Sequence, residues 1–237
     1  MKLITWNCQG AFREKANFIL NHNPDILVVQ ECEHPDKLIY SSTVQKPTDY
    51  LWFGDNLNKG LAVFSYGKFK LKLYENHNPD FKLIAPIFVT GGKFDFTLFA
   101  IWANNPQNKN NQYIEQVWYA INHYDNLLNS GNTILTGDFN SNKIWDKKHK
   151  DRNHSAVVER LKSKSIESLY HLHLKQEQGK EEHPTFHLQR KKEKPYHIDY
   201  CFVSSDICTK FESLEIGDYE NWVEYSDHIP LIVNFKK

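Results

Sequence analysis

The sequence predicts a single α/β domain, and three observations support that prediction. The chain of 237 residues is 40% hydrophobic and 14% aromatic, which is enough apolar material to bury one large core. Short β-rich runs alternate with segments of helical periodicity along its length. No composition shift, internal repeat or Pro/Ser-rich linker divides residues 1–237. We therefore expect one domain rather than two.

The chain opens with a strand, a helix and a second strand. Residues 2–8 are rich in β-forming residues, and residues 12–21 place apolar side chains at helical spacing. Asn23-Pro24 ends this helix, because the residue before a proline disfavours the helical conformation. The run DILVVQE at residues 25–31 is almost continuously apolar, which predicts a strand buried on both faces.

The same alternation continues to the end of the chain. Periodicity predicts a helix over 113–128 that leads into a strand from 133, and a second helical region over 155–161 whose continuation to 174 is left open. β-rich runs punctuated by Gly and Asn predict a mostly antiparallel meander with strands at 50–53, 60–66, 69–74, 83–90 and 94–103. Three C-terminal strands are predicted at 197–203, 214–216 and 229–235.

Charge and hydropathy limit the classes of partner. Lys plus Arg and Asp plus Glu each number 29, so the chain has no global positive field to hold it on a nucleic acid, and any phosphate-bearing partner must be held locally. No window approaches the ~18 apolar residues of a membrane span, so no membrane partner is expected. The N-terminal run loses its apolar character by Asn7, too early for a signal peptide, and we expect a cytoplasmic monomer with no obligate protein partner.

The cysteines have no Cys-x-x-Cys spacing for zinc or redox chemistry, which predicts reduced core residues. The two in the N-terminal strands directly follow polar residues and should face away from whatever those residues face. The four positions are Cys8, Cys32, Cys201 and Cys208.

Polar residues stand at the edges of five apolar runs. In TGDFN, residues 136–140, Asp138 and Asn140 follow a buried strand and should point the same way if the extended geometry persists. Taken alone, this string is more typical of a plain turn than of a catalytic site. The other four edges carry Asn7, Glu31, Asp199 and the pair Asp227-His228.

This set of residue types indicates a hydrolytic site. Carboxylates beside buried strands are costly unless they are paired, hydrogen-bonded or bound to a cation. Hard divalent cations such as Mg²⁺ prefer oxygen ligands, whereas zinc would need more His or Cys. A further carboxylate would orient or deprotonate a water, and another would hold the imidazole in the right tautomer. This equipment is typical of metal-assisted phosphate-ester hydrolysis, and no Gly-rich phosphate loop or Gly-x-Ser-x-Gly elbow indicates kinase-like or acyl-hydrolase chemistry.

Six stretches together resemble the endonuclease/exonuclease/phosphatase superfamily, which has the deoxyribonuclease I-like fold. They are LITWNCQG, NPDILVVQE, KGLAVFSY, TGDFNS, HIDYCFV and SDHIPLIV, in the family's order. The resemblance implies one such domain over residues 1–237. It also implies a four-layer αββα sandwich of two mixed, mostly antiparallel sheets flanked by helices, with the site at one end of the sheets.

The resemblance also implies the metal ligands. Glu31 would be the main Mg²⁺ ligand, with Asn7 and Asp227 on the metal or its waters. Mn²⁺ is the expected substitute for Mg²⁺.

The catalytic roles follow in the same way. Asp138 would orient or deprotonate the attacking water, and Asn140 would help to fix that water and the phosphate. His228, held by Asp199, would contact the scissile phosphate and stabilise charge in the transition state.

The chain departs from the family pattern in LFAIWANNP. Family members usually place a His or Tyr there against the phosphate, and this chain has Trp102. The indole N–H would donate a hydrogen bond, or Asn104 or Asn105 would substitute, or Trp102 is simply core or rim packing.

Two basic clusters flank the motifs and are candidates for contacts with polymer phosphates, although charge runs are often just solvated loops. Trp145 beside the first cluster would stack on a base. The candidate basic residues are Lys147, Lys148, Arg190, Lys191 and Lys192.

The leading hypothesis is a Mg²⁺-dependent phosphodiesterase that hydrolyses nucleic acid by in-line attack of water. The first alternative is a phosphatase of a small phosphorylated metabolite or a lipid headgroup. The second is a non-catalytic binding module on the same fold, against which the intact set of seven polar residues argues.

Overall fold

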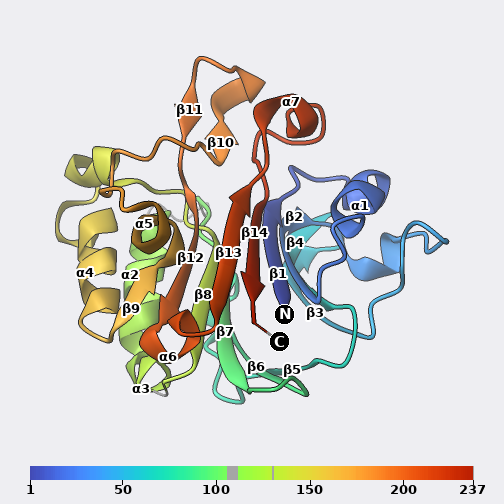
Figure 1. Cartoon of the computed structure of the whole chain (residues 1–237), viewed down its shortest axis with the longest axis horizontal. Helices are drawn as coiled ribbons and strands as arrows, with labels where there is room; N and C mark the ends of the chain where they lie inside the picture. Colours follow the sequence, from blue (N-terminus) through green and yellow to red (C-terminus); the bar gives the residue numbers. More distant parts are fainter. Residues whose placement is uncertain (106–111, 130, 237) are drawn as a thin grey trace.

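Two six-stranded sheets pack face to face, with helices on the outer face of each, in the computed structural model (Figure 1). The structure describes residues 1–105, 112–129 and 131–236. This is the four-layer α/β sandwich that the resemblance implied. In the described part of the chain, one neighbouring pair of strands in each sheet is parallel and the other pairs are antiparallel.

The first sheet has the strand order β13-β14-β1-β2-β4-β3. Its parallel pair is β1 (Lys2–Asn7) and β2 (Ile26–Cys32), which are connected through α1 (Phe12–Leu20). The other strands of this sheet are β3 (Asp49–Asn56), β4 (Lys59–Ser65), β13 (Phe211–Ile216) and β14 (Leu231–Phe235).

The second sheet has the order β5-β6-β7-β8-β12-β9. Its parallel pair is β7 (Phe96–Trp102) and β8 (Thr133–Asp138), between which lie α2 (Ile114–His123) and α3 (Asp125–Leu128). The other strands are β5 (Lys70–Leu73), β6 (Ile84–Thr90), β9 (Ile166–Ser168) and β12 (Asp199–Ser204).

The remaining elements are short. A hairpin of β10 (Phe186–His187) and β11 (Pro195–Tyr196) stands above the sheets beside α7 (Tyr219–Trp222), at the top of Figure 1. The others are α4 (His154–Lys162), α5 (Leu169–Leu174), α6 (Ser205–Cys208) and the 3₁₀ turns η1 (Pro35–Lys37), η2 (Pro79–Phe81), η3 (Lys143–Lys148), η4 (Lys150–Arg152) and η5 (Leu188–Arg190).

Strand alternation divides the apolar side chains into three layers. In β1, Leu3 packs between the two sheets, whereas Ile4 and Trp6 pack on the side of α1. In β8, Ile134 faces the space between the sheets and Leu135 faces α2 and α4. Because both faces of each central strand are covered, these strands have the continuous apolar runs seen in the sequence.

One expected helix is interrupted, and the open question about the second helical region is settled. The helix expected over 113–128 is broken at Tyr124, where φ is −93° and ψ is 26°, and the Tyr124 hydroxyl accepts a hydrogen bond from the backbone N–H of Asn78. The region after α4 does not continue as a helix to 174. Ser165 turns the chain with a φ of 58°, and β9 then pairs with β12 before α5 begins.

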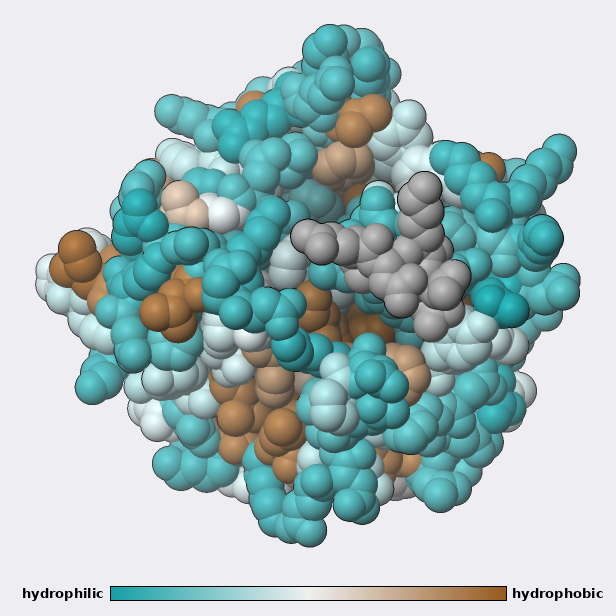
Figure 2. Space-filling model, turned by 180° about the vertical axis from the view of Figure 1, so that it is seen from behind, coloured by the Kyte–Doolittle hydropathy of each residue, from teal (hydrophilic) through white to brown (hydrophobic). Residues whose placement is uncertain are grey.

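All four cysteines are free. Cys8, just after β1, Cys32 in β2 and Cys201 in β12 are buried, whereas Cys208 is partly exposed. Cys8 and Cys32 lie in the layer beneath α1, away from the space between the sheets, as expected. Figure 2 shows the back of the molecule, which is mostly hydrophilic, with hydrophobic residues gathered in its lower middle. Within the described residues, no helix combines the length and the apolar character needed to cross a membrane.

Candidate active site

The predicted polar residues of four central strands meet at one end of the sandwich. Asn7 follows Leu3 and Thr5 on the face of β1 that looks toward the second sheet, and Asp138 follows Ile134 on the facing side of β8. The two side chains therefore meet across the interface between the sheets. The amide nitrogen Nδ2 of Asn7 donates a hydrogen bond of 3.0 Å to Oδ2 of Asp138.

Asp138 and Asn140 share one patch, but not through an extended chain. Asn140 has a φ of 47°, so the strand ends in a turn and the condition of extended geometry does not hold. The Asn140 backbone N–H donates to Oδ1 of Asp138 at 2.8 Å, and its side-chain Nδ2 donates to Oδ2 at 2.9 Å. The turn and the shared site are thus one feature.

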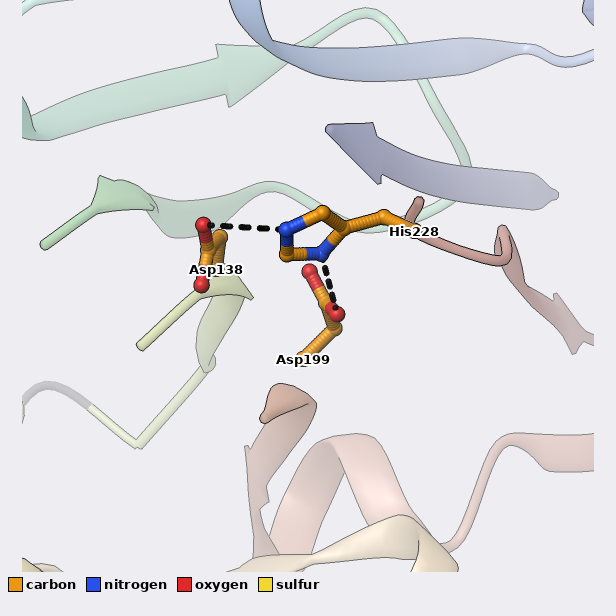
Figure 3. Close-up of side chains that lie close together, drawn as sticks. All are labelled: Asp138, Asp199 and His228. Atoms are coloured by element: carbon orange, nitrogen blue, oxygen red, sulfur yellow. Dashed lines mark hydrogen bonds and ion pairs between the residues drawn. The ribbon is translucent and has the colours of Figure 1, made fainter. Parts of the chain in front are cut away.

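His228 lies between two buried carboxylates (Figure 3). Its Nδ1 is 2.9 Å from Oδ2 of Asp199, and its Nε2 is 3.9 Å from Oδ2 of Asp138. Asp199 is itself held in place, because the hydroxyl of Thr185 accepts a hydrogen bond from its backbone N–H. Trp6 donates its indole N–H to the backbone carbonyl of His228, which fixes the loop that carries the imidazole.

The charges in this cluster depend on one another. Burial raises the pKa of Asp138 to about 7, the positive charge of His228 counteracts that rise, and Asp199 adds to it. Burial alone would lower the pKa of His228, but the two facing carboxylates, with Asp199 first, raise it above its usual value. His228 is therefore a cation near neutral pH, with Nδ1–H donating to Asp199 and Nε2–H directed at Asp138.

Glu31 reaches the site through an irregularity in β2. Regular alternation after Leu27 and Val29 would place Glu31 on the face covered by α1. Instead Glu31 has a φ of 61°, the pairing with β4 shifts register here, and Cys32 takes the buried position under α1. Such a bulge re-aims a side chain. Oε1 of Glu31 lies 3.5 Å from Nδ2 of Asn7.

Asp227, the third expected metal ligand, precedes the imidazole on the same loop. Its backbone carbonyl accepts a hydrogen bond from the N–H of His187, which ties the loop to β10. Burial raises the pKa of Asp227, and the nearby charge of Glu31 raises it further. The charges of these two carboxylates therefore influence each other.

The donor set fits a divalent cation. Ligand atoms of Asp138, Asp199 and His228 all lie within 4.8 Å of one another, and Oδ1 of Asp199 is a buried atom with no hydrogen-bond partner among the described residues. However, the charged imidazole between those carboxylates has no free lone pair for a metal. Further carboxylate oxygens belong to Glu31, beside Asn7, and to Asp227, on the loop before His228. Mg²⁺ needs only one or two such carboxylates.

The three candidates at the end of β7 and just after it differ in their surroundings. Trp102 pairs with Asp138 in the sheet register, is buried between the sheets, and has the ammonium of Lys59 5.7 Å from its ring centroid. Asn104 accepts hydrogen bonds from Nε2 of Gln116 through its backbone carbonyl and through Oδ1. Asn105 is exposed.

The first basic cluster is free to meet a substrate. Trp145, Lys147 and Lys148 lie on η3, and Asn142 begins this turn by accepting the N–H of Ile144. Both lysines are exposed, and the ammonium of Lys148 lies 5.6 Å from the centroid of the Trp145 ring.

The second basic cluster is mostly engaged within the protein. Arg190 donates to Oε1 of Gln9 and to backbone carbonyls of the loop before Asp227, so it closes the hairpin onto the site. Lys192 forms an ion pair with Glu220, and Lys191 is exposed.

An aromatic row that the sequence did not reveal leads away from the imidazole. The ring of Phe186 lies 4.7 Å from His228, Tyr196 lies 6.3 Å from Phe186, and Trp145 lies 5.0 Å from Tyr196. We call Phe186, Tyr196 and Trp145 the aromatic row. Trp145 is far from the other two residues in the sequence. Phe186 and Tyr196 stand before and within the stretch that leads to HIDY, and their aromatic character was the signal in the sequence for the row.

The sequence profile of the endonuclease/exonuclease/phosphatase family matches residues 4–228. The chain belongs to this family. This endonuclease/exonuclease/phosphatase family member is accordingly a phosphoric ester hydrolase. No curated protein matches the chain.

Solved structures share the fold of this family member over its whole length. A 3'-5' exonuclease from Neisseria meningitidis is 18% identical with a TM-score of 0.67, and an AP endonuclease from Archaeoglobus fulgidus is 14% identical with a TM-score of 0.69. A family protein from Leptotrichia buccalis C-1013-b is 18% identical with a TM-score of 0.60. In each comparison, 100% of both chains is covered.

Proposed function

We propose that the protein is a Mg²⁺-dependent nuclease that hydrolyses phosphodiester bonds by in-line attack of water. The observation that supports the proposal most directly is the buried chain of Asp199, His228 and Asp138, with Asn7 and Asn140 on the same carboxylate. This arrangement puts a base, a cation and two amides at the end of the sheets. It also fits a binding-only protein poorly, because buried charges are costly to keep without a use.

Each group has a role that follows from its contacts. Asp138 is the proposed base, because its raised pKa of about 7 lets it accept a proton from water near neutral pH. Asn140 holds the carboxylate through two hydrogen bonds and so orients its free lone pairs. The imidazolium of His228, held by Asp199, donates to a non-bridging phosphate oxygen as negative charge develops there.

Glu31, Asn7 and Asp227 are the proposed holders of the cation, with Mn²⁺ as the substitute. A bound Mg²⁺ would supply Lewis-acid stabilisation of the phosphoryl oxygens and of the leaving group. The chain contributes these oxygen donors, and the amide of Asn7 joins Glu31 to Asp138 through its Nδ2.

Nucleic acid is the proposed substrate because the aromatic row and Lys148 extend from His228. A row of rings beside an ammonium suits unstacked bases and their phosphates. Solved neighbours include AP endonucleases and a structure described as a 3' phosphatase bound to a product DNA hairpin. We also propose that the protein consists of one domain and acts as a monomer.

The test is a cleavage panel with Mg²⁺ and with EDTA. Single- and double-stranded DNA and RNA, an abasic duplex, a 3'-phosphorylated oligonucleotide and a simple phosphomonoester would be compared. Asp138→Ala should lower the activity at least about 10²-fold and leave the circular dichroism spectrum unchanged. Asp151 is an exposed acid on η4, and Asp151→Ala should change neither the activity nor the spectrum. Full activity in Asp138→Ala would refute the assignment. Release of inorganic phosphate alone would favour the phosphatase.

A further inference from the structure

Lys59 places a positive charge against the expected metal ligand. It is the first residue of β4, opposite the bulge of β2, and its Nζ lies 2.7 Å from Oε2 of Glu31. The same Nζ lies 5.7 Å from the centroid of the Trp102 ring, over the end of β7. Lys59 thus joins the two sheets at the mouth of the site, between a carboxylate and an aromatic face.

This ion pair is not built for stability. The side chain of Lys59 is 49% exposed, and exposed ion pairs contribute little to folding. Glu31 is 20% exposed, and besides its pair with Lys59 it accepts a long hydrogen bond of 3.5 Å from Asn7. The ammonium is therefore free to exchange Glu31 for another anion without loss of buried contacts.

The negative charge of the site indicates a role for the ammonium of Lys59. The cluster contains four carboxylates, Glu31, Asp138, Asp199 and Asp227, against one imidazolium. A divalent cation would leave it with one net negative charge, and the phosphodiester brings another. Lys59 is the ammonium that balances this charge at Glu31, so it lowers the electrostatic cost of bringing a phosphate beside four carboxylates.

Trp102 explains why a separate cation is needed on this side of the site. It stands beside Asp138 in the sheet register, and its indole carries no charge and accepts no proton. The Trp102 ring is instead buried between the sheets and presents its face to Lys59. A ring face attracts a cation and keeps the long lysine side chain extended along the sheet edge.

We propose that Lys59 is a catalytic residue of this hydrolase, which binds a non-bridging oxygen of the scissile phosphate when a metal cation occupies Glu31. Trp102 is its positioning residue. The proposal rests on the proposed function and adds to it a phosphate contact from the first sheet, opposite the one from His228. The phosphate is then held from both sides of the interface between the sheets.

The test compares Lys59→Met and Lys59→Arg with Lys82→Met. Lys82 is the matched control, because it is similarly exposed, at 42%, and pairs with Asp55 on the neighbouring strand β3. Three quantities would be measured: kcat on a single-stranded oligonucleotide at saturating Mg²⁺, Mn²⁺ affinity by electron paramagnetic resonance without substrate, and oligothymidylate affinity in Ca²⁺ by fluorescence anisotropy.

Lys59→Met is expected to lower kcat about 10²-fold, as the loss of one charged donor to a transition state does, and to weaken oligothymidylate binding. Lys59→Arg should recover part of both. Mn²⁺ should bind Lys59→Met as tightly as the wild type or more tightly, because its competitor for Glu31 is gone. Lys82→Met should match the wild type in all three.

Three results would overturn the inference. They are a kcat of Lys59→Met within threefold of the wild type, a loss of kcat that higher Mg²⁺ fully restores, and a large loss of Mn²⁺ affinity. The last two would make Lys59 only a support for the metal ligand. If the wild type and Lys82→Met cleave nothing, the proposed function fails instead, and the anisotropy measurement still decides whether Lys59 binds phosphate.

Discussion

Gly137 is the position where a single methyl group should do most damage. Its φ is +142°, a conformation that side chains rarely adopt, and a Cβ placed there would lie 1.9 Å from the backbone oxygen of Ile101 on β7. Real Cβ contacts under 3.0 Å essentially never occur, so β7 and β8 would have to separate by roughly 1 Å in Gly137→Ala. The obstacle is backbone, which cannot rotate away as a flexible side chain does.

The expected cost can be worked from these two effects. Backbone strain of this kind costs about 1–3 kcal/mol, and overpacking a tight contact costs a similar amount. The free energy of unfolding should therefore fall by about 2–6 kcal/mol, which lowers Tm by at least about 5 °C for a chain of this size. Asp138 is the next residue, and a shift of about 1 Å in a catalytic group costs about 10²-fold in rate.

Urea denaturation followed by circular dichroism would measure the loss, and steady-state kinetics at a temperature where Gly137→Ala stays folded would measure the activity. Gly67→Ala is the matched control, because a Cβ there meets nothing within 4 Å. It should change the free energy of unfolding by less than about 1 kcal/mol. A loss under about 1 kcal/mol in Gly137→Ala, with normal activity, would refute the close approach of β7 and β8.

Three further predictions concern the site and its supports. Asp199→Asn removes the charge that raises the pKa of His228, so kcat at saturating Mg²⁺ should fall at least about 10²-fold, and an unchanged kcat would contradict the charged imidazole. Trp145→Ala should raise KM for single-stranded oligonucleotides about tenfold, since stacking contributes about 1–3 kcal/mol per base, and equal KM values would exclude the aromatic row. Burial alone would raise the pKa of Glu181, but hydrogen bonds, with that from His171 first, lower it to about 2 from 4.5. Its stabilisation is therefore present above pH 4.5 and lost as pH falls toward 2, so Glu181→Gln should be less stable than the wild type in urea melts at pH 7, with a smaller difference at pH 3.

Strand alternation made much of the site predictable from the sequence. Asn7, Asp138 and Asp199 each continue the inward-facing series of its strand, so their convergence follows from which residues are apolar. The break of the helix at Tyr124 was not predictable in this way, because it depends on a hydrogen bond from Asn78, far away in the sequence.

Glu31 marks the limit of that reasoning. Alternation places it under α1, and only a left-handed residue in β2 turns it to the site. It was a candidate because it ends an apolar run, and its role as a metal ligand came from the family motif. Lys59 and the aromatic row were missed for a related reason: their roles depend on loops and strand ends that pack against one another, and no local pattern records such contacts.

The pairing of β1 with β14 lets the site form only when segments from both ends of the described chain are present. β14 supplies the neighbour of β1, and the backbone N–H of Phe235 bonds the carbonyl of Met1. His228 lies just before that strand, whereas Asn7 ends the first one. A ribosome must therefore synthesise nearly all of the described residues before the imidazole can meet its carboxylates.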